Sequence, residues 1–142
     1  MENTEGLAIS NEHGRRKLLV LVIDDNPQYG RLLDLLSEQL GITAHRVADC
    51  RQGMAALKKL SFDVVMMDWL MPEVDGAACT AHIRAMEAEL GKRTPIIGVT
   101  GYINVTREMC LKADMDDFLS VPFTFEELRS KLSRWVQVQS QG

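Results

Sequence analysis

Runs of hydrophobic residues alternate with amphipathic segments over most of the chain. Six consecutive apolar residues, Leu18–Ile23, stand directly before a pair of acids, and this pattern predicts a strand that is buried on both faces. The segment 26–41 begins with Asn26 and Pro27, ends at Gly41 and carries leucines at helical spacing, which predicts an amphipathic helix. The same two patterns repeat and predict strands at 42–47, 62–68, 95–101 and 116–121, and helices at 50–60, 77–90, 103–113 and 124–138.

Five strands that alternate with five helices predict an α/β fold, with helices on both faces of a parallel sheet. Right-handed crossovers leave few topologies, and the flavodoxin-like order 2-1-3-4-5 is the one expected for a doubly wound sheet of this size. This order places a functional cleft at the carboxyl ends of the first and third strands. We expect residues 17–138 to form the domain, residues 1–16 to be a flexible N-terminal tail and residues 139–142 a C-terminal tail.

Composition narrows the function classes. The chain has 142 residues, of which 46% are hydrophobic and 25% charged, with a net charge of -4, and this is typical of a soluble domain without a nucleic-acid-binding face. It has no apolar run long enough for a membrane span and no signal-peptide core, so we expect a cytoplasmic protein. Cys50, Cys79 and Cys110 are far apart and odd in number, and we expect them to be reduced and partly buried.

Acids follow two of the buried strands. Asp24 and Asp25 come directly after the first, and Asp68 ends the third. Because the carboxyl ends of parallel neighbours meet at one edge of the sheet, the three carboxylates are expected to converge there. Such a cluster is usually offset by a cation, and ligands that are all oxygen favour Mg²⁺. Thr100 and Gly101 end the fourth strand and are expected beside Asp68 on the same edge.

These residues resemble the receiver domains of two-component response regulators, over about residues 17–138. The resemblance rests on "VIDDN" after the first strand, on "MMDWLMPEVDG" around Asp68, on Thr100 and on the Pro-Phe after the last strand. It is closest to the receivers of hybrid kinases and phosphorelays.

The resemblance implies a role for each site residue. Asp68 would be the phosphoacceptor, which attacks a phospho-histidine on a sensor histidine kinase or a histidine-phosphotransfer protein. Asp25, Asp68 and the backbone carbonyl of Leu70 would bind Mg²⁺ directly, and Asp24 would hold it through water. Thr100 would bond a phosphoryl oxygen and move after phosphorylation, while Phe118 would rotate inward with it. Three residues would flank the phosphoryl group as rim residues: Trp69, Leu70 and Tyr102.

Two positions depart from the family pattern. The family has a lysine directly before the proline that follows the last strand, and this chain has Val121 at that position. The family also usually has a glycine at the position of Asp114. A charge-assisted hydrogen bond is worth roughly 1.5–3 kcal/mol, about as much as a typical allosteric coupling. We therefore expect Mg²⁺ binding to survive and the conformational switch to be weakened or rewired.

Three functions remain open at this point. The first is a single-domain phosphoacceptor that catalyses only its own phosphotransfer and dephosphorylation, and so is not an enzyme with a separate substrate. The second is a pseudo-receiver that acts only by binding proteins. The third is a Mg²⁺-dependent phosphatase, but that class needs an acid two residues after the nucleophile, where this chain has Leu70. The resemblance further implies a monomer or weak dimer, whose downstream partner binds the face of the fourth helix, fifth strand and fifth helix.

Overall fold

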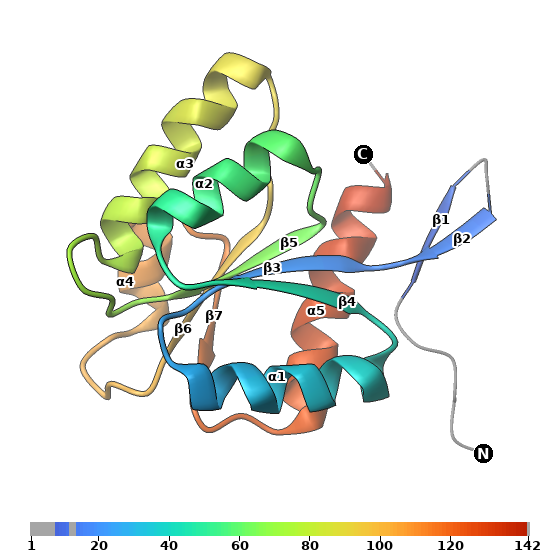
Figure 1. Cartoon of the computed structure of the whole chain (residues 1–142), viewed down its shortest axis with the longest axis horizontal. Coiled ribbons are helices and arrows are strands. Elements are labelled where there is room, and N and C mark those ends of the chain that lie inside the picture. Colours follow the sequence, from blue (N-terminus) through green and yellow to red (C-terminus); the bar gives the residue numbers. More distant parts are fainter. Residues whose placement is uncertain (1–7, 12–13, 142) are drawn as a thin grey trace.

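A five-stranded parallel sheet forms the centre of a computed structural model of the chain, which describes residues 8–11 and 14–141 (Figure 1). The strands lie in the order β4-β3-β5-β6-β7, which confirms the predicted 2-1-3-4-5 order. Their bounds are β3 Leu19–Ile23, β4 Thr43–Val47, β5 Val64–Asp68, β6 Ile96–Thr100 and β7 Asp117–Ser120. The helices are α1 Pro27–Leu40, α2 Cys50–Lys59, α3 Gly76–Leu90, α4 Arg107–Lys112 and α5 Phe125–Gln141.

Both faces of the sheet are buried, as the apolar runs predict. Along β3, Val20 and Val22 belong to one buried cluster and Leu21 and Ile23 to another, because successive side chains of a strand point to opposite faces. The first cluster also contains residues of α1 and α5, and the second contains residues of α2, α3 and α4. Figure 1 accordingly shows α1 on one side of β3 and β4, and α2 and α3 on the other.

The helix ends are set by residues that the sequence identifies. Helix α1 begins at Pro27, and at the start of α5 the backbone N–H of Thr124 donates to Glu127 while that of Glu127 donates to the Thr124 hydroxyl, each at 3.1 Å. Helix α4 has only six residues, shorter than the predicted 103–113, because it starts only after Thr106, whose hydroxyl caps it by accepting from Met109 N.

Both chain ends differ from the sequence prediction. The segment assigned to a flexible tail contains two antiparallel strands, β1 Ala8–Asn11 and β2 Gly14–Lys17. Arg16 binds Asp63 by two hydrogen bonds of 2.8 and 2.9 Å, and this long-range contact has no local sequence signal. At the other end, α5 continues to Gln141 and takes up most of the predicted C-terminal tail.

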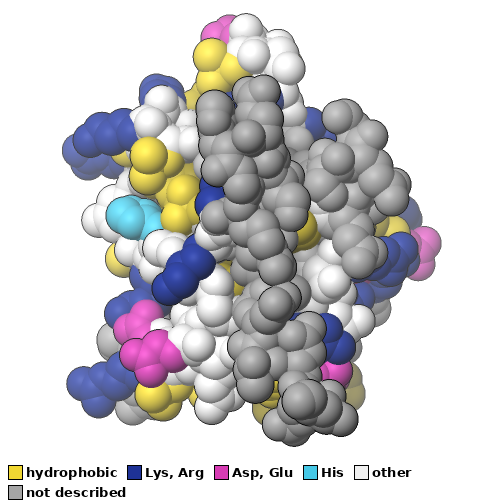
Figure 2. All heavy atoms as spheres, turned by 90° about the vertical axis from the view of Figure 1, so that its right-hand side faces the viewer, with side chains coloured by type: hydrophobic (Ala, Val, Ile, Leu, Met, Phe, Trp, Pro, Cys, Tyr) yellow, Lys and Arg dark blue, Asp and Glu magenta, His cyan; other side chains and the backbone are white. Residues whose placement is uncertain are grey.

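Figure 2 views the end of the molecule at which β1 and β2 lie. The lysines and arginines of its described part are scattered over that face rather than gathered into one patch.

The expectation of three reduced cysteines is wrong for two of them. Cys50 and Cys79 form a disulfide that joins α2 to α3, whereas Cys110 is free and buried. The packing of these two helices brings together two thiols that are 29 residues apart, and spacing alone cannot reveal such a pair.

A buried carboxylate joins β7 to the two helices that flank it. Asp117 is fully buried and accepts hydrogen bonds from Lys131 Nζ, Trp135 Nε1 and its neighbour's backbone N–H, each at 2.8 Å. Arg107 of α4 contributes a longer bond of 3.4 Å. Burial acts to raise the pKa of Asp117, but the hydrogen bonds from Lys131, Trp135 and the Phe118 N–H hold it below its ordinary value.

Asp114, at the position where the family usually has a glycine, adopts a backbone conformation that glycine favours. Asp114 has a φ of +72°, in the left-handed region where glycine is favoured and aspartate is among the better-tolerated alternatives. Its carboxylate lies 3.1 Å from Arg93. The residue therefore keeps the turn after α4 that a glycine would make.

Candidate active-site cleft

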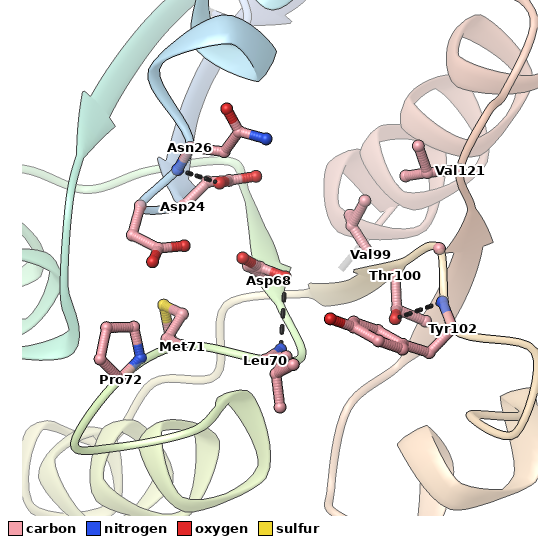
Figure 3. A pocket seen from close by; sticks show the side chains of 12 residues that line it. Asp24, Asn26, Asp68, Leu70, Met71, Pro72, Val99, Thr100, Tyr102 and Val121 are labelled. Carbon is pink, nitrogen blue, oxygen red and sulfur yellow. Dashed lines mark hydrogen bonds between the residues drawn. The ribbon is translucent and has the colours of Figure 1, made fainter.

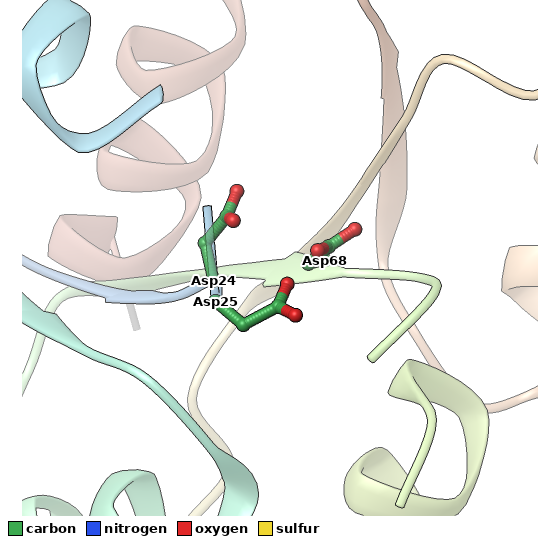
Figure 4. Close-up of side chains that lie close together, drawn as sticks. All are labelled: Asp24, Asp25 and Asp68. Carbon is green, nitrogen blue, oxygen red and sulfur yellow. The ribbon is translucent and has the colours of Figure 1, made fainter. Parts of the chain in front are cut away.

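Three carboxylates meet at the carboxyl edge of the sheet, as the sequence predicts (Figure 4). Asp24 and Asp25 directly follow β3, and Asp68 ends the neighbouring strand β5. One oxygen atom from each of the three lies within 4.8 Å of the other two.

Backbone N–H groups orient two of these carboxylates. Asp24 Oδ1 accepts from Asn26 N at 2.8 Å, and Asp68 Oδ1 accepts from Leu70 N at 3.3 Å (Figure 3). Each bond spans two residues, so each acid is fixed by the turn that follows its own strand. Both acids, together with Asp25, line the cleft.

The opposite wall of the cleft comes from β6 and β7. Thr100 ends β6 with only 4% of its surface exposed, and its Oγ1 accepts from Tyr102 N at 3.1 Å. Val121 N donates to the Thr100 carbonyl at 2.9 Å, which fixes Val121 beside it. In Figure 3, Val121 lies on the same side of the cleft as Thr100, across from Asn26. The cleft is lined by Asp24, Asp25, Asn26, Asp68, Leu70, Met71, Pro72, Val99, Thr100, Gly101, Tyr102 and Val121.

No lysine or arginine is among the described residues that line this cleft. The pKa of Asp68 is raised to about 7, first by burial and then by the charges of Asp24 and Asp25, against the lowering effect of the Leu70 N–H. The pKa of Asp24 is raised for similar reasons, with burial the largest. The three carboxylates therefore repel each other, and none of the described residues that line the cleft supplies a positive charge beside them.

The carboxylates fit a magnesium ion. Mg²⁺ prefers oxygen ligands at about 2.0–2.1 Å, so two direct ligands lie no more than about 4.2 Å apart. A spread of up to 4.8 Å therefore suits a set in which one carboxylate binds through water, since Mg²⁺ readily keeps part of its hydration shell.

Most of the predicted site residues come together in this cleft. The exceptions are Trp69 and Phe118, which are partly buried and pack against the core on the side of α2, α3 and α4. The sequence interpretation missed Asn26, Met71, Pro72 and Val99 as lining residues. Their only signal was that each stands within a few residues of an acid or of Thr100.

Residues 20–133 match the family model of the response regulator receiver domain. The chain belongs to the receiver domain family of two-component signalling. Among curated proteins, this receiver domain is similar to the transcription factor SKN7 of Saccharomyces cerevisiae, with 34% identity over 87% of the chain, and to the sensor histidine kinase RcsC of Salmonella typhi, with 33% identity over 96%. It spans only 19% of SKN7 and 14% of RcsC.

The fold is also similar to a solved receiver domain, that of the sensor histidine kinase PA1611 from Pseudomonas aeruginosa. The TM-score is 0.77 with 34% sequence identity, over 86% of this chain and 99% of the other. That domain was crystallised with a magnesium ion coordinated in its active site cleft. None of the described helices combines the length and the apolar composition needed to cross a bilayer.

Proposed function

We propose that this receiver domain accepts a phosphoryl group on Asp68 from a phospho-histidine of a partner protein. The observation that supports this most is the position of Asp68 between two further carboxylates and Thr100, at the mouth of an open cleft. A carboxylate so placed can be approached by a partner's side chain, and its neighbours supply oxygen ligands for the cation that phosphoryl transfer requires.

The transfer needs positioning more than acid–base chemistry. An oxygen of Asp68 attacks phosphorus while the bond from phosphorus to the donor histidine nitrogen breaks, and that nitrogen keeps the electron pair. Bound Mg²⁺ would neutralise the charge on the transferring oxygens, held directly by Asp25, Asp68 and the Leu70 carbonyl and through water by Asp24. The Thr100 hydroxyl would donate to a phosphoryl oxygen, for which it must rotate from its bond with Tyr102 N.

Phosphorylation by a small donor tests the proposal. We expect incubation with Mg²⁺ and acetyl phosphate to add one phosphoryl group, seen as a mass increase of the intact protein, and Asp68→Asn to abolish it because no other carboxylate occupies that place at the end of β5. If neither acetyl phosphate nor a phosphorylated histidine-phosphotransfer protein produced an adduct, the pseudo-receiver function would be correct instead. Val121 is the observation that keeps this second candidate open, since it removes a charge that links chemistry to conformation.

Binding of Mg²⁺ should depend on pH between 6 and 8. With a pKa of about 7, Asp68 holds a proton below pH 7 that the cation must displace, and it is ionised above that pH. We expect the affinity to be about tenfold lower at pH 6 than at pH 8, with proton release on binding. Isothermal titration calorimetry at the two pH values, in buffers of different ionisation enthalpy, measures both; equal affinities would contradict the assignment of Asp68 as a direct ligand.

The two exposed rim residues are expected to prolong the phosphorylated state. Leu70 and Tyr102 are 51% and 56% exposed at the cleft, where their bulk would hinder an attacking water molecule. Replacing both by serine should speed hydrolysis roughly tenfold, as measured by the decay of radiolabelled Asp68 phosphate. Loss of the wild-type label within seconds in the presence of Mg²⁺ would contradict this prediction.

The signal is proposed to leave through the face formed by α4, β7 and α5, to a protein partner. Asp117 couples these three elements and precedes Phe118, the aromatic proposed to rotate. In this role the domain is a phosphoacceptor rather than an enzyme. We propose that it acts as a monomer or weak dimer and binds no nucleic acid. It would lie in the cytoplasm together with its phosphoryl donor.

A further inference from the structure

The disulfide joins α2 to α3, the helices that come after strands β4 and β5 in the chain. Cys50 is the first residue of α2, and Cys79 lies in the first turn of α3. Both sulfurs belong to the buried cluster between the sheet and these helices, with residue exposures of 6% and 0%. Figure 1 shows α2 and α3 side by side, in agreement with their contacts.

The α3 end of this link lies against the backbone of the phosphoacceptor. A Cβ atom placed on Gly76, the first residue of α3, would lie 2.4 Å from the carbonyl oxygen of Asp68. Gly76 N also donates to Trp69 O at 2.8 Å. The position of the first turn of α3, and of Cys79 within it, is therefore tied to the position of Asp68 and the loop that follows it.

The α2 end of the link lies behind the other two acids. Asp24 N donates to Val47 O at 3.1 Å. Val47, the last residue of β4, lines a hollow together with Gln52 of α2 and with Asp24 and Asp25. A covalent bond from α2 to α3 thus connects the segment beside Asp24 and Asp25 to the segment beside Asp68.

We propose that Cys50 and Cys79 form a redox-controlled link that sets the Mg²⁺ affinity of the cleft, with the disulfide form binding more tightly. The proposal rests on the function assigned to the three carboxylates. The disulfide restricts the relative movement of the two segments that carry or support the ligands, so less freedom remains to be lost when a cation orders them. Reduction releases α2 from α3 and restores that freedom.

The chemistry is thiol–disulfide exchange with a cellular dithiol. A thiolate of the reductant attacks the Sγ of Cys50, the more exposed of the two; the S–S bond breaks, and Cys79 leaves with the electron pair and takes up a proton. The second thiol of the reductant then attacks the mixed disulfide, which releases Cys50 and leaves the reductant oxidised by two electrons. An oxidised dithiol drives the reverse reaction.

The third cysteine provides an internal control. Cys110 belongs to α4, where it is fully buried beside Gly98, and burial together with the charge of Asp117 raises its pKa to about 11. It stays a protonated thiol, which is a poor nucleophile. Cys110→Ser should leave the redox response of the domain unchanged.

The test compares Mg²⁺ binding of the whole chain in its two redox forms. The native protein is equilibrated with oxidised or reduced dithiothreitol, and its state is read by alkylating unfolded samples: one free thiol in the disulfide form and three in the reduced form. Isothermal titration calorimetry with MgCl₂ at pH 8 should show at least about fivefold weaker binding after reduction, the lower limit of typical coupling between sites. The double variant Cys50→Ala/Cys79→Ala should bind like the reduced protein and not respond to dithiothreitol.

Three outcomes would overturn the proposal. The first is a disulfide that the reductant cannot open in the folded protein, and the second is an affinity that changes by less than about twofold on reduction, well below typical coupling. A response of the double variant to dithiothreitol would be the third. Equal Mg²⁺ binding in both forms would remove the redox link and leave the proposed function intact, whereas the absence of binding in both would contradict the proposed function as well.

Discussion

Replacing Val121 by lysine should lower the pKa of Asp68 from about 7 by roughly 1–3 units, because an opposite charge nearby favours the ionised carboxylate. Val121 lines the cleft and its backbone is fixed by the bond to Thr100, so a longer side chain at this position can extend toward the three carboxylates. The shift corresponds to about 1.4–4 kcal/mol, comparable with the coupling that drives a typical allosteric change.

A titration of carboxyl-labelled protein by NMR in the absence of Mg²⁺ measures this pKa. Val121→Met is the matched control, since it adds length without charge and should leave the pKa near its original value. We also expect the lysine variant to undergo a larger conformational change on phosphorylation, seen in amide exchange of α4 and β7. If the wild-type and lysine variants changed equally, Val121 would not be what limits the switch.

Removing the carboxylate of Asp117 should lower the free energy of unfolding by about 3 kcal/mol, the lower end of the range for breaking a buried ion pair. Lys131 and Arg107 have side chains that are 28% and 49% exposed and can turn to water, but the indole N–H of Trp135 and the backbone N–H of Phe118 would lose their acceptor. Urea unfolding of Asp117→Ala measures the loss.

A surface ion pair serves as the control for this variant. Glu126→Ala removes a pair with Arg129 in which both side chains are exposed, and its stability should not change measurably. Because the pKa of Asp117 is lowered in the folded state, its contribution is present above the ordinary carboxyl pKa and is lost as the pH falls below it. A loss of stability in Asp117→Ala that stayed constant down to pH 2 would contradict this account.

Local sequence signals predicted the elements and the acidic site for a physical reason. A strand buried on both faces, such as β3 or β5, must be apolar throughout, and the acids that end it lie at the same edge as those of its neighbour. Cap residues such as Thr124 act on the backbone within their own turn. Each of these features depends on residues that are close in sequence or on the regular geometry of a parallel sheet, so the pattern alone was sufficient.

The features that were missed depend on contacts between distant residues. Nothing in "GRRK" marks a strand; the structure places Arg16 of that strand against Asp63. The pairing of Cys50 with Cys79 depends on how two helices pack. The departure at Asp114 became clear only from its positive φ. Sequence patterns therefore located the cleft, and the three-dimensional packing showed what surrounds and supports it.

The ion pair of Arg16 and Asp63 bears on where the folding unit begins. The side chain of Asp63 is only 8% exposed, and besides Arg16 it accepts a hydrogen bond from Leu19 N at 2.7 Å. A chain shortened to the family match, which starts at residue 20, would lose both donors and leave a buried carboxyl group without these two partners. We therefore expect the minimal stable fragment of this protein to be longer than the segment 20–133 that identifies its family, and to include Arg16 and Leu19.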